Sequence, residues 1–432
     1  MKRSISMLLA ILTLAGTLTL PSMAAEPEDE EGTAQESVQE DGSAQTDETE
    51  AAEAEPEPDP AGTVSWANLE SRIRSGSLSA LILAENIGSI EVIDYDQMAQ
   101  DIRDQLNGIA DLQWMMILMG DRMSANSLDQ TYDSLRENFD AIQDGEMQAD
   151  NADVVWQLED TVNQVVSGGE TLYITLVGLE QQAADGQRGL DTIDRNREQL
   201  RLRQQLGQVS QQTVEELEQT RSQTVSQLQT LDTTIRQMKA QLQTLIGETP
   251  TGEITLGPLP TQDTMEWEEP DYEADLEAAK AASWTLRDAQ KTLEDAEETW
   301  EDARDEYRLP SEQYLYQQAE HVWNAAQFTY DSTVQNFEVG FQTLYNTMIN
   351  DQQVLEAAQS ALAWQQTLLE TAQTRYDLGL ISYSEVLTAQ DNVASAQSTV
   401  DSAWRDLFTA RSSYRWAVES GLMQSSNTAS AS

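Results

Sequence analysis

Few residues in this chain have side chains suited to catalysis. His321 is the only histidine and there is no cysteine, so a Ser/His/Asp or Cys/His arrangement would depend on this one residue, and thiolate metal sites are excluded. No glycine-rich phosphate loop follows a strand-like segment. The simplest interpretation of His321 is an ordinary residue of a helix. We therefore predict that the protein is not an enzyme and holds no cofactor or metal.

The charge of the chain excludes a second class of partner. Seventy-six Asp and Glu against 24 Lys and Arg give a formal net charge of −52. A polyanion of this size repels nucleic acid, so we predict no nucleic-acid partner. Most of the carboxylates are spread around helical faces, where they are solvated surface charges.

The chain begins with the features of an exported protein. Lys2 and Arg3 precede an apolar run from Met7 to Leu20, and small residues follow up to Ala25, as in a cleavable secretory signal peptide. We predict a signal peptide at residues 1–25 and a location in the cell envelope. This means the outer membrane or periplasm if the organism has one, and otherwise an extracytoplasmic or cell-wall-associated site.

An acidic segment follows the predicted signal peptide. Residues 26–60 contain fifteen Asp or Glu and no Lys or Arg. Such a segment cannot bury enough apolar surface to offset the conformational entropy that is lost on folding, so we predict a disordered linker at 26–62. We also predict a Pro/Gly linker at 249–270 and a disordered tail at 422–432.

The rest of the chain repeats one unit. Residues 171–175 (TLYIT) are matched by 343–347 (TLYNT), and 206–210 (LGQVS) by 378–382 (LGLIS), with one and the same offset in residue number. An unchanged offset excludes insertions and deletions between the two landmarks. A long internal repeat of this kind determines the fold.

Both repeats carry the heptad pattern of long coiled-coil helices. Apolar positions alternate at spacings of three and four from Val214 to Leu245 and again from Val386 to Ala417, which is typical of a left-handed coiled coil. The pattern predicts helices over 272–308, 311–376 and 383–420. The predicted fold is therefore all-α, with two tandem long coiled-coil helical hairpins that form repeat 1 (63–248) and repeat 2 (271–421).

A tight turn joins the two long helices of each hairpin. Gly207 and Gly379 suit the left-handed conformation that closes a helix C-terminus. Ser382 and Glu385 predict a capping box at the start of the following helix. The first copy keeps Ser210 but has a threonine at the Glu position.

The residues at these turns are candidates for a docking site. Exposed apolar side chains on a tight turn are suited to contact with a partner, although ordinary turn residues are the alternative interpretation. The candidate docking residues are Gly207, Gln208, Val209, Ser210, Gly379, Leu380, Ile381, Ser382 and Glu385.

Residues 375–390 (RYDLGLISYSEVLTAQ) resemble the hairpin tip of TolC-like outer-membrane efflux proteins. Residues 66–76 resemble the opening helix of that family, and the resemblance extends over about 63–421. It implies a homotrimer whose helices form an α-helical tunnel. It also implies that the tips dock a periplasmic or extracytoplasmic adaptor, a membrane-fusion protein, which serves an inner-membrane pump.

The resemblance gives a possible role to one acidic residue. Related tunnels narrow at acidic rings near the tip, so three copies of Asp377 could surround an aperture, although an ordinary Asp at a helix end is the simpler interpretation. Asp351 is also unusual, because it occupies a heptad position between Met348 and Leu355 where an apolar residue is expected.

The sequence departs from the family where the membrane strands belong. Such strands need about 9 to 11 residues with alternating polarity, and neither the residues after Pro310 nor residues 120–152 show this pattern. We therefore expect the β-barrel strands to be reduced or absent. The apolar run at 114–119 is interpreted as helix packing first and as a partner surface second.

Two functional hypotheses follow. The first is a TolC-like component of an export or efflux system, a trimeric α-helical duct that docks a membrane-fusion adaptor through its hairpin tips. The alternative is a non-conducting coiled-coil scaffold or interaction protein of the cell envelope. The oligomeric state separates them, because a single copy cannot enclose a tunnel.

Overall fold

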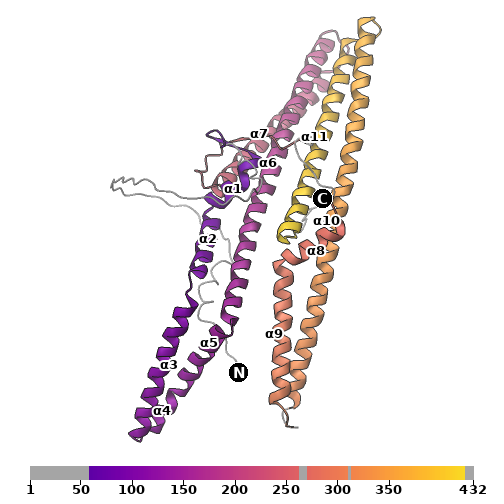
Figure 1. The fold of residues 1–432 in the computed structure, drawn as a ribbon. Coiled ribbons are helices and arrows are strands. Elements are labelled where there is room, and N and C mark those ends of the chain that lie inside the picture. The colour runs from indigo at the N-terminus through magenta and orange to yellow at the C-terminus, as the bar shows by residue number, and fades with distance from the viewer. Residues whose placement is uncertain (1–57, 262–269, 310–312, 424–432) are drawn as a thin grey trace, which may run out of the picture. The chain divides into compact units, whose positions relative to one another are not determined.

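The computed structural model describes residues 58–261, 270–309 and 313–423. Within these ranges the chain forms eleven α-helices and two strands of two residues each (Figure 1), and the predicted all-α fold is confirmed. The predicted signal peptide and most of the acidic linker lie outside the described residues, as do parts of the Pro/Gly linker and of the C-terminal tail.

The four helices of repeat 2 have counterparts in the same order in repeat 1, which has further elements between its second short helix and its first long helix. Repeat 1 contains β1 (Thr63–Val64), α1 (Trp66–Gly76), α2 (Leu78–Glu91), α3 (Tyr95–Leu118), α4 (Arg122–Ser127), α5 (Asp129–Gln143), α6 (Glu146–Gln205) and α7 (Gln211–Leu245). The strand β2 (Thr255–Leu256) follows and pairs in parallel with β1. Repeat 2 contains α8 (Tyr272–Ala282), α9 (Trp284–Glu306), α10 (Gln313–Asp377) and α11 (Tyr383–Ser420).

Two constant offsets in residue number relate the repeats. The long-helix offset maps α6 and α7 onto α10 and α11, and it places Gln211 at the start of α7 on Tyr383 at the start of α11. The short-helix offset maps α1 and α2 onto α8 and α9, and it places Leu78 at the start of α2 on Trp284 at the start of α9. The short-helix offset is the larger of the two. Repeat 1 therefore has more residues between α2 and α6 than repeat 2 has between α9 and α10.

The helix predicted over 272–308 is in fact two helices. Ser283 separates α8 from α9 with an extended backbone (φ −78°, ψ 112°), and Ser77 separates α1 from α2 in the same way. The turn at Gly421 packs against the break, because a Cβ atom on Gly421 would lie 2.3 Å from the Cα of Ser283. The heptad pattern gives no sign of the break, because the apolar spacing continues through it.

The predicted apolar seams are buried. Every seam position from Val214 to Leu245 and from Val386 to Ala417 is buried or half-buried. The seam of α11 packs against Phe341, Met348 and Leu355 of α10. Full burial of one large apolar side chain contributes about 1.5–3 kcal/mol, so the seams hold α6 against α7 and α10 against α11.

The run at 114–119 is exposed except at Met116, which is half-buried. Trp114 is 65% exposed and Met119 is 71% exposed at the end of α3, so helix packing, the first interpretation of this run, is wrong for these side chains. Among the described residues, no helix combines the length and the apolarity that a membrane span requires.

Asp59 anchors the start of repeat 1. Its carboxylate accepts hydrogen bonds from the Ser65 backbone N–H at 3.0 Å, from Asn68 Nδ2 at 2.9 Å and from Arg72 Nη1 at 3.0 Å. These bonds tie residue 59, which the sequence analysis places within the linker at 26–62, to α1.

We expect acid to weaken this anchor. Burial alone would raise the pKa of Asp59, but hydrogen bonds from Ser65, Asn68 and Arg72 lower this pKa to about 2, from an ordinary value of 3.8. A lowered pKa in the folded state stabilises the fold above the ordinary pKa, and this stability is lost as the pH falls from 3.8 towards 2. Urea unfolding should show Asp59→Asn less stable by about 1–2 kcal/mol at neutral pH. The difference should shrink towards pH 2, and a constant difference would contradict the assignment.

Candidate docking tips and the junction between the repeats

The turns after α6 and α10 have the same backbone conformation. Gly207 has φ 69° and Gly379 has φ 71°, so the predicted left-handed glycines are confirmed. In the second turn the Leu380 N–H donates to the Arg375 carbonyl at 2.9 Å and the Gly379 N–H to the Tyr376 carbonyl at 2.8 Å, which is a Schellman motif. The first turn makes the equivalent bonds at 2.8 and 2.9 Å.

The candidate docking residues differ in exposure. Val209 and Ile381 are half-buried, whereas the other candidates are exposed, namely Gly207, Gln208, Ser210, Gly379, Leu380, Ser382 and Glu385. Leu206 and Leu378, which precede the glycines, are 65% and 68% exposed and were not among the predicted residues. The Leu-Gly pair repeated in both turns was the signal that could have identified them.

Of the two serines at the starts of α7 and α11, the one predicted to form a complete capping box makes no side-chain cap bond, and the other one does. Ser382 makes no side-chain cap bond to α11, and the Glu385 N–H donates instead to the Ser382 carbonyl at 3.1 Å. The predicted capping box is therefore wrong, because the tightened first turn already satisfies this N–H. Ser210 does cap α7, since its Oγ accepts a hydrogen bond from the Thr213 N–H at 3.2 Å.

This difference predicts unequal effects of two serine substitutions. Ser210→Ala removes a cap bond and should lower the free energy of unfolding by about 1 kcal/mol. Ser382→Ala removes no such bond and should change it by no more than a few tenths. Urea denaturation of the two variants measures both effects, and equal losses would show that the two serines cap alike.

The two singled-out acidic residues do not come together. Asp377 is exposed in the last turn of α10, and Asp351 is half-buried in the same helix. Their separation along the helix is about 39 Å, at a rise of roughly 1.5 Å per residue. Burial raises the pKa of Asp406 on α11, Arg405 opposes this shift and Asp351 adds to it.

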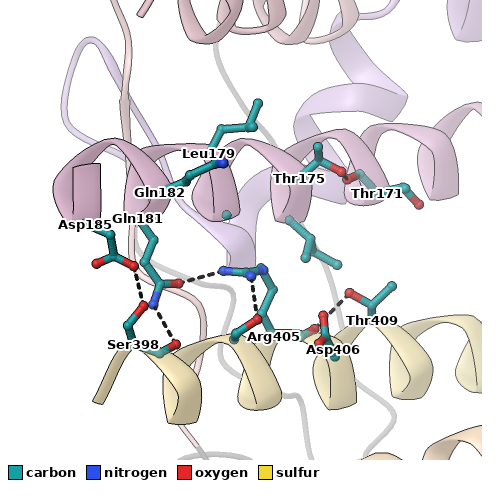
Figure 2. Close-up of a pocket in the computed structure, with 13 residues that line it drawn as sticks. Thr171, Thr175, Leu179, Gln181, Gln182, Asp185, Ser398, Arg405, Asp406 and Thr409 are labelled. Carbon is teal, nitrogen blue, oxygen red and sulfur yellow. Dashed lines mark hydrogen bonds between the residues drawn. The ribbon is translucent and has the colours of Figure 1, made fainter. Parts of the chain in front are cut away.

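The two repeats meet along α6 and α11. Figure 2 shows Arg405 of α11 reaching Gln181 of α6, where its Nη1 donates to Oε1 at 2.6 Å. Ser398 donates to Asp185 in the same groove, which has a volume of about 470 Å³. Arg405 lies over Gly178, where a Cβ atom would be 2.9 Å from its Nε. Further along the two helices, Arg195 Nη2 of α6 pairs with Asp391 of α11 at 2.8 Å.

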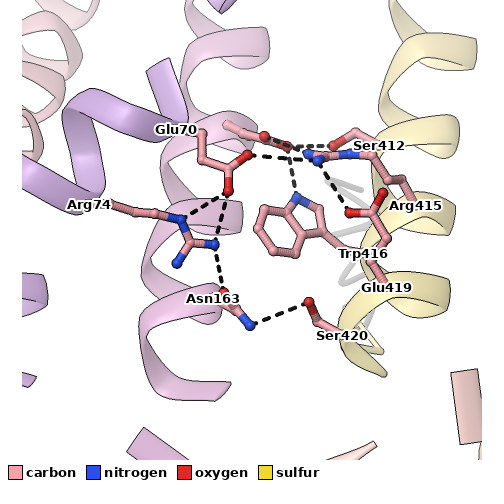
Figure 3. A network of polar contacts seen from close by, with 9 residues as sticks. Glu70, Arg74, Asn163, Ser412, Arg415, Trp416, Glu419 and Ser420 are labelled. Atoms are coloured by element: carbon pink, nitrogen blue, oxygen red, sulfur yellow. Dashed lines mark hydrogen bonds and ion pairs between the residues drawn. The ribbon is translucent and has the colours of Figure 1, made fainter. Parts of the chain in front are cut away.

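A buried carboxylate forms the centre of this junction. Glu170 of α6 is 4% exposed and accepts hydrogen bonds from Arg415 Nη2 at 2.7 Å, Ser412 Oγ at 2.8 Å and Trp416 Nε1 at 2.8 Å. Figure 3 shows these three donors on α11, with Glu70 and Arg74 of α1 nearby. A buried charge is tolerated when it is paired and hydrogen-bonded in this way. The sequence pattern gives no sign of the network, because Glu170 and its partners lie in different repeats, far apart along the chain.

A second contact between the repeats joins α6 to α9. The rings of Trp156 and Trp284 meet edge to face with their centroids 6.1 Å apart. Next to them, Asp153 pairs with Arg287 at 3.3 Å and with Lys291 at 2.7 Å, and Asp150 pairs with Lys291 at 2.7 Å. Aromatic packing and ion pairs therefore hold α9 of repeat 2 against α6 of repeat 1.

Comparisons with known proteins give one family match and several structures with the same fold. Residues 311–413 match the sequence model of the family described as outer membrane efflux protein. The fold is shared with the outer-membrane channel OprN, at 12% identity and a TM-score of 0.51 over 83% of this chain and 90% of that chain. It is shared with CusC at 14% identity and a TM-score of 0.50 over 81% and 91% of the two chains.

Another similar structure is the outer membrane protein VceC of Vibrio cholerae, with 13% identity and a TM-score of 0.47 over 82% of this chain and 96% of that chain. No curated protein matches the sequence. The resemblance to TolC-like outer-membrane efflux proteins is confirmed, and residues 311–413 carry the sequence match to that family.

Proposed function

We propose that the protein is a TolC-like component of an export or efflux system in the cell envelope. Three copies form an α-helical duct, and the hairpin tips dock a membrane-fusion adaptor that serves a pump. The family match over 311–413 and the fold shared with the channels OprN and CusC support this class of function.

The observation that carries the proposal is the interface between the two repeats. It is formed once within the chain, and, among the described residues, most of the equivalent pair of surfaces has no partner within the chain. In the chain, α6 meets α11. At the long-helix offset, the equivalent of Arg415 is Gln243 of α7, which is buried. The equivalents of the contact residues between Gln181 and Arg195 of α6 lie on α10, those of the contact residues between Asp391 and Arg405 of α11 lie on α7, and all of these are exposed. On α10 they are Gln353, Ala357, Ser360, Trp364 and Thr367, and on α7 they are Gln219, Ser222, Ser226, Gln229 and Thr233.

An interface between two different surfaces either closes into a ring or grows without end. The α7 face of one copy would meet the α10 face of the next copy, as α11 meets α6 within the chain. The resemblance implies three copies. In a ring of three copies, three junctions within chains would alternate with three junctions between chains. A closed ring of this kind encloses the passage that an export duct requires.

The open face of α10 has the spacing of a coiled-coil seam. Val354, Ala357, Ala361, Trp364 and Leu368 alternate at spacings of three and four and are all exposed. Trp364 is 61% exposed, a large area for an aromatic side chain that no other helix covers among the described residues. The spacing favours a second helix as the partner of this face.

Two measurements test the proposal. Light scattering on residues 26–432 should give the mass of three copies, whereas a monomer at all concentrations would favour the scaffold alternative. A photo-cross-linking residue at Leu380, expressed in the native host, should attach to a membrane-fusion adaptor. The same residue at Val92, which is 78% exposed but far from the tips in the sequence, is the control. A trimer without adaptor adducts at Leu380 would overturn the docking role.

A further inference from the structure

We propose that neighbouring copies are joined by an apolar contact in addition to the face of α10 described above. Leu78, Leu81 and Ile82 on α2 of one copy pack against Val322, Ala325 and Phe328 on α10 of the next, and we call these six residues the apolar latch. The inference rests on the proposed function, because both concern the same ring of copies.

The template for the apolar latch is the contact between α6 and α9 within the chain. There the Trp156 ring meets the Trp284 ring. Trp156 of α6 corresponds to Phe328 of α10 at the long-helix offset, and Trp284 of α9 corresponds to Leu78 of α2 at the short-helix offset. Phe328 and Leu78 are each 71% exposed. Both rings of the Trp156–Trp284 pair therefore correspond to large apolar side chains that are exposed in the single chain.

Most of the charged residues that form the ion pairs of the template have apolar equivalents. Asp150 and Asp153 of α6 correspond to Val322 and Ala325 of α10, which are exposed. On the other side, Arg287 of α9 corresponds to Leu81 of α2, which is 41% exposed. Three of the four charged side chains of the template are thus exchanged for apolar ones. The fourth, Lys291 of α9, corresponds to Glu85 of α2, which is exposed and follows the latch residues along the helix.

The charge of the chain favours a second copy as the occupant. Each copy carries a formal net charge of −52, so copies repel one another unless they meet through uncharged surface. Residues 78–84 of α2 (LSALILA) contain no charged side chain. The corresponding face of α10 is uncharged at its three latch positions. A contact of this type is also insensitive to salt, unlike the exposed parts of the Asp–Arg template.

Cross-linking tests the proximity of the two faces. The chain has no cysteine, so Leu78→Cys with Phe328→Cys introduces the only two thiols. A short bis-maleimide should then produce covalent dimers and trimers. The pair Val92→Cys with Phe328→Cys is the matched control and should remain uncoupled. A trimer by light scattering without coupling above this control would overturn the apolar latch and leave the duct intact, whereas a monomer would overturn both proposals.

A charge-pair rescue tests the complementarity. Leu81→Arg and Ala325→Asp should each raise the dissociation constant of assembly by about tenfold, because each sets a charge against apolar surface. Together they recreate the Arg287–Asp153 pair between copies and should restore assembly to within about threefold. All the altered side chains are exposed in the single chain, and circular dichroism verifies the fold. Additive losses in the double variant would overturn the assignment of these partners.

Discussion

Replacing Glu170 by alanine should lower the free energy of unfolding by about 2–4 kcal/mol. The carboxylate is buried and accepts three hydrogen bonds from α11. Its removal leaves the Trp416 indole N–H without its acceptor at a buried site, and breaking such pairs costs about 3–5 kcal/mol when both partners are buried. The Arg415 side chain is 38% exposed and can regain water, which reduces the expected loss.

The matched control for this substitution is Glu70→Ala. Glu70 belongs to the same network, where it pairs with Arg74 at 2.9 Å and with Arg415 at 3.8 Å, but its side chain is 39% exposed. An exposed ion pair contributes about 0–1 kcal/mol, so its loss should be small. Urea unfolding of both variants gives the comparison. Equal losses would show that burial of Glu170 does not determine the strength of the junction.

Gly421→Val should be much more damaging than Gly379→Val. Both glycines have positive φ, 63° and 71°, where a β-branched residue is strained by roughly 1–2 kcal/mol. A Cβ atom on Gly379 meets nothing within 4 Å, whereas on Gly421 it would lie 2.3 Å from the Ser283 backbone. This clash adds about 1–3 kcal/mol, so we expect losses of about 2–5 kcal/mol for Gly421→Val and about 1–2 kcal/mol for Gly379→Val.

Thermal unfolding followed by circular dichroism distinguishes the two effects. Gly421→Val should lower the melting temperature and release α8 from the end of α11, because the break at Ser283 packs against this turn. Gly379→Val should leave the melting temperature near that of the unchanged protein but disturb the tip. If the two variants melt alike, then backbone strain alone accounts for both, and close packing at Gly421 is not important.

Local patterns predict the parts of this fold that depend on local chemistry. The long helices α10 and α11 follow from heptads, and the tip turns follow from a glycine that must adopt positive φ. The same patterns miss the break at Ser283, because the apolar spacing continues through it and the turn that packs against it comes from the far end of the repeat. They also miss Glu170, because no spacing along α6 reveals that Arg415 and Trp416 will surround it.

The candidate tips show the same limit on a smaller scale. The sequence places Leu380 and Ile381 at one turn, but only the structure shows that Leu380 is exposed while Ile381 is half-buried. It also adds Leu378, whose exposure depends on how the last turn of α10 ends. The capping prediction failed for a similar reason, because Ser382 and Glu385 can satisfy one N–H in two ways and the pattern Ser-x-x-Glu does not decide between them.

The two repeat offsets show that the two ends of the hairpins differ in how well their lengths agree between the repeats. From the long helices to the tips the halves have kept the same length, residue for residue, through the divergence of nearly all their side chains. Under the proposed function both tips reach one adaptor, and arms that reach one common partner cannot change length independently. On the opposite side repeat 1 has gained, or repeat 2 has lost, a stretch of chain around α3, α4 and α5. The two repeats therefore differ in length at that end, whereas the arms that lead to the two tips have the same length.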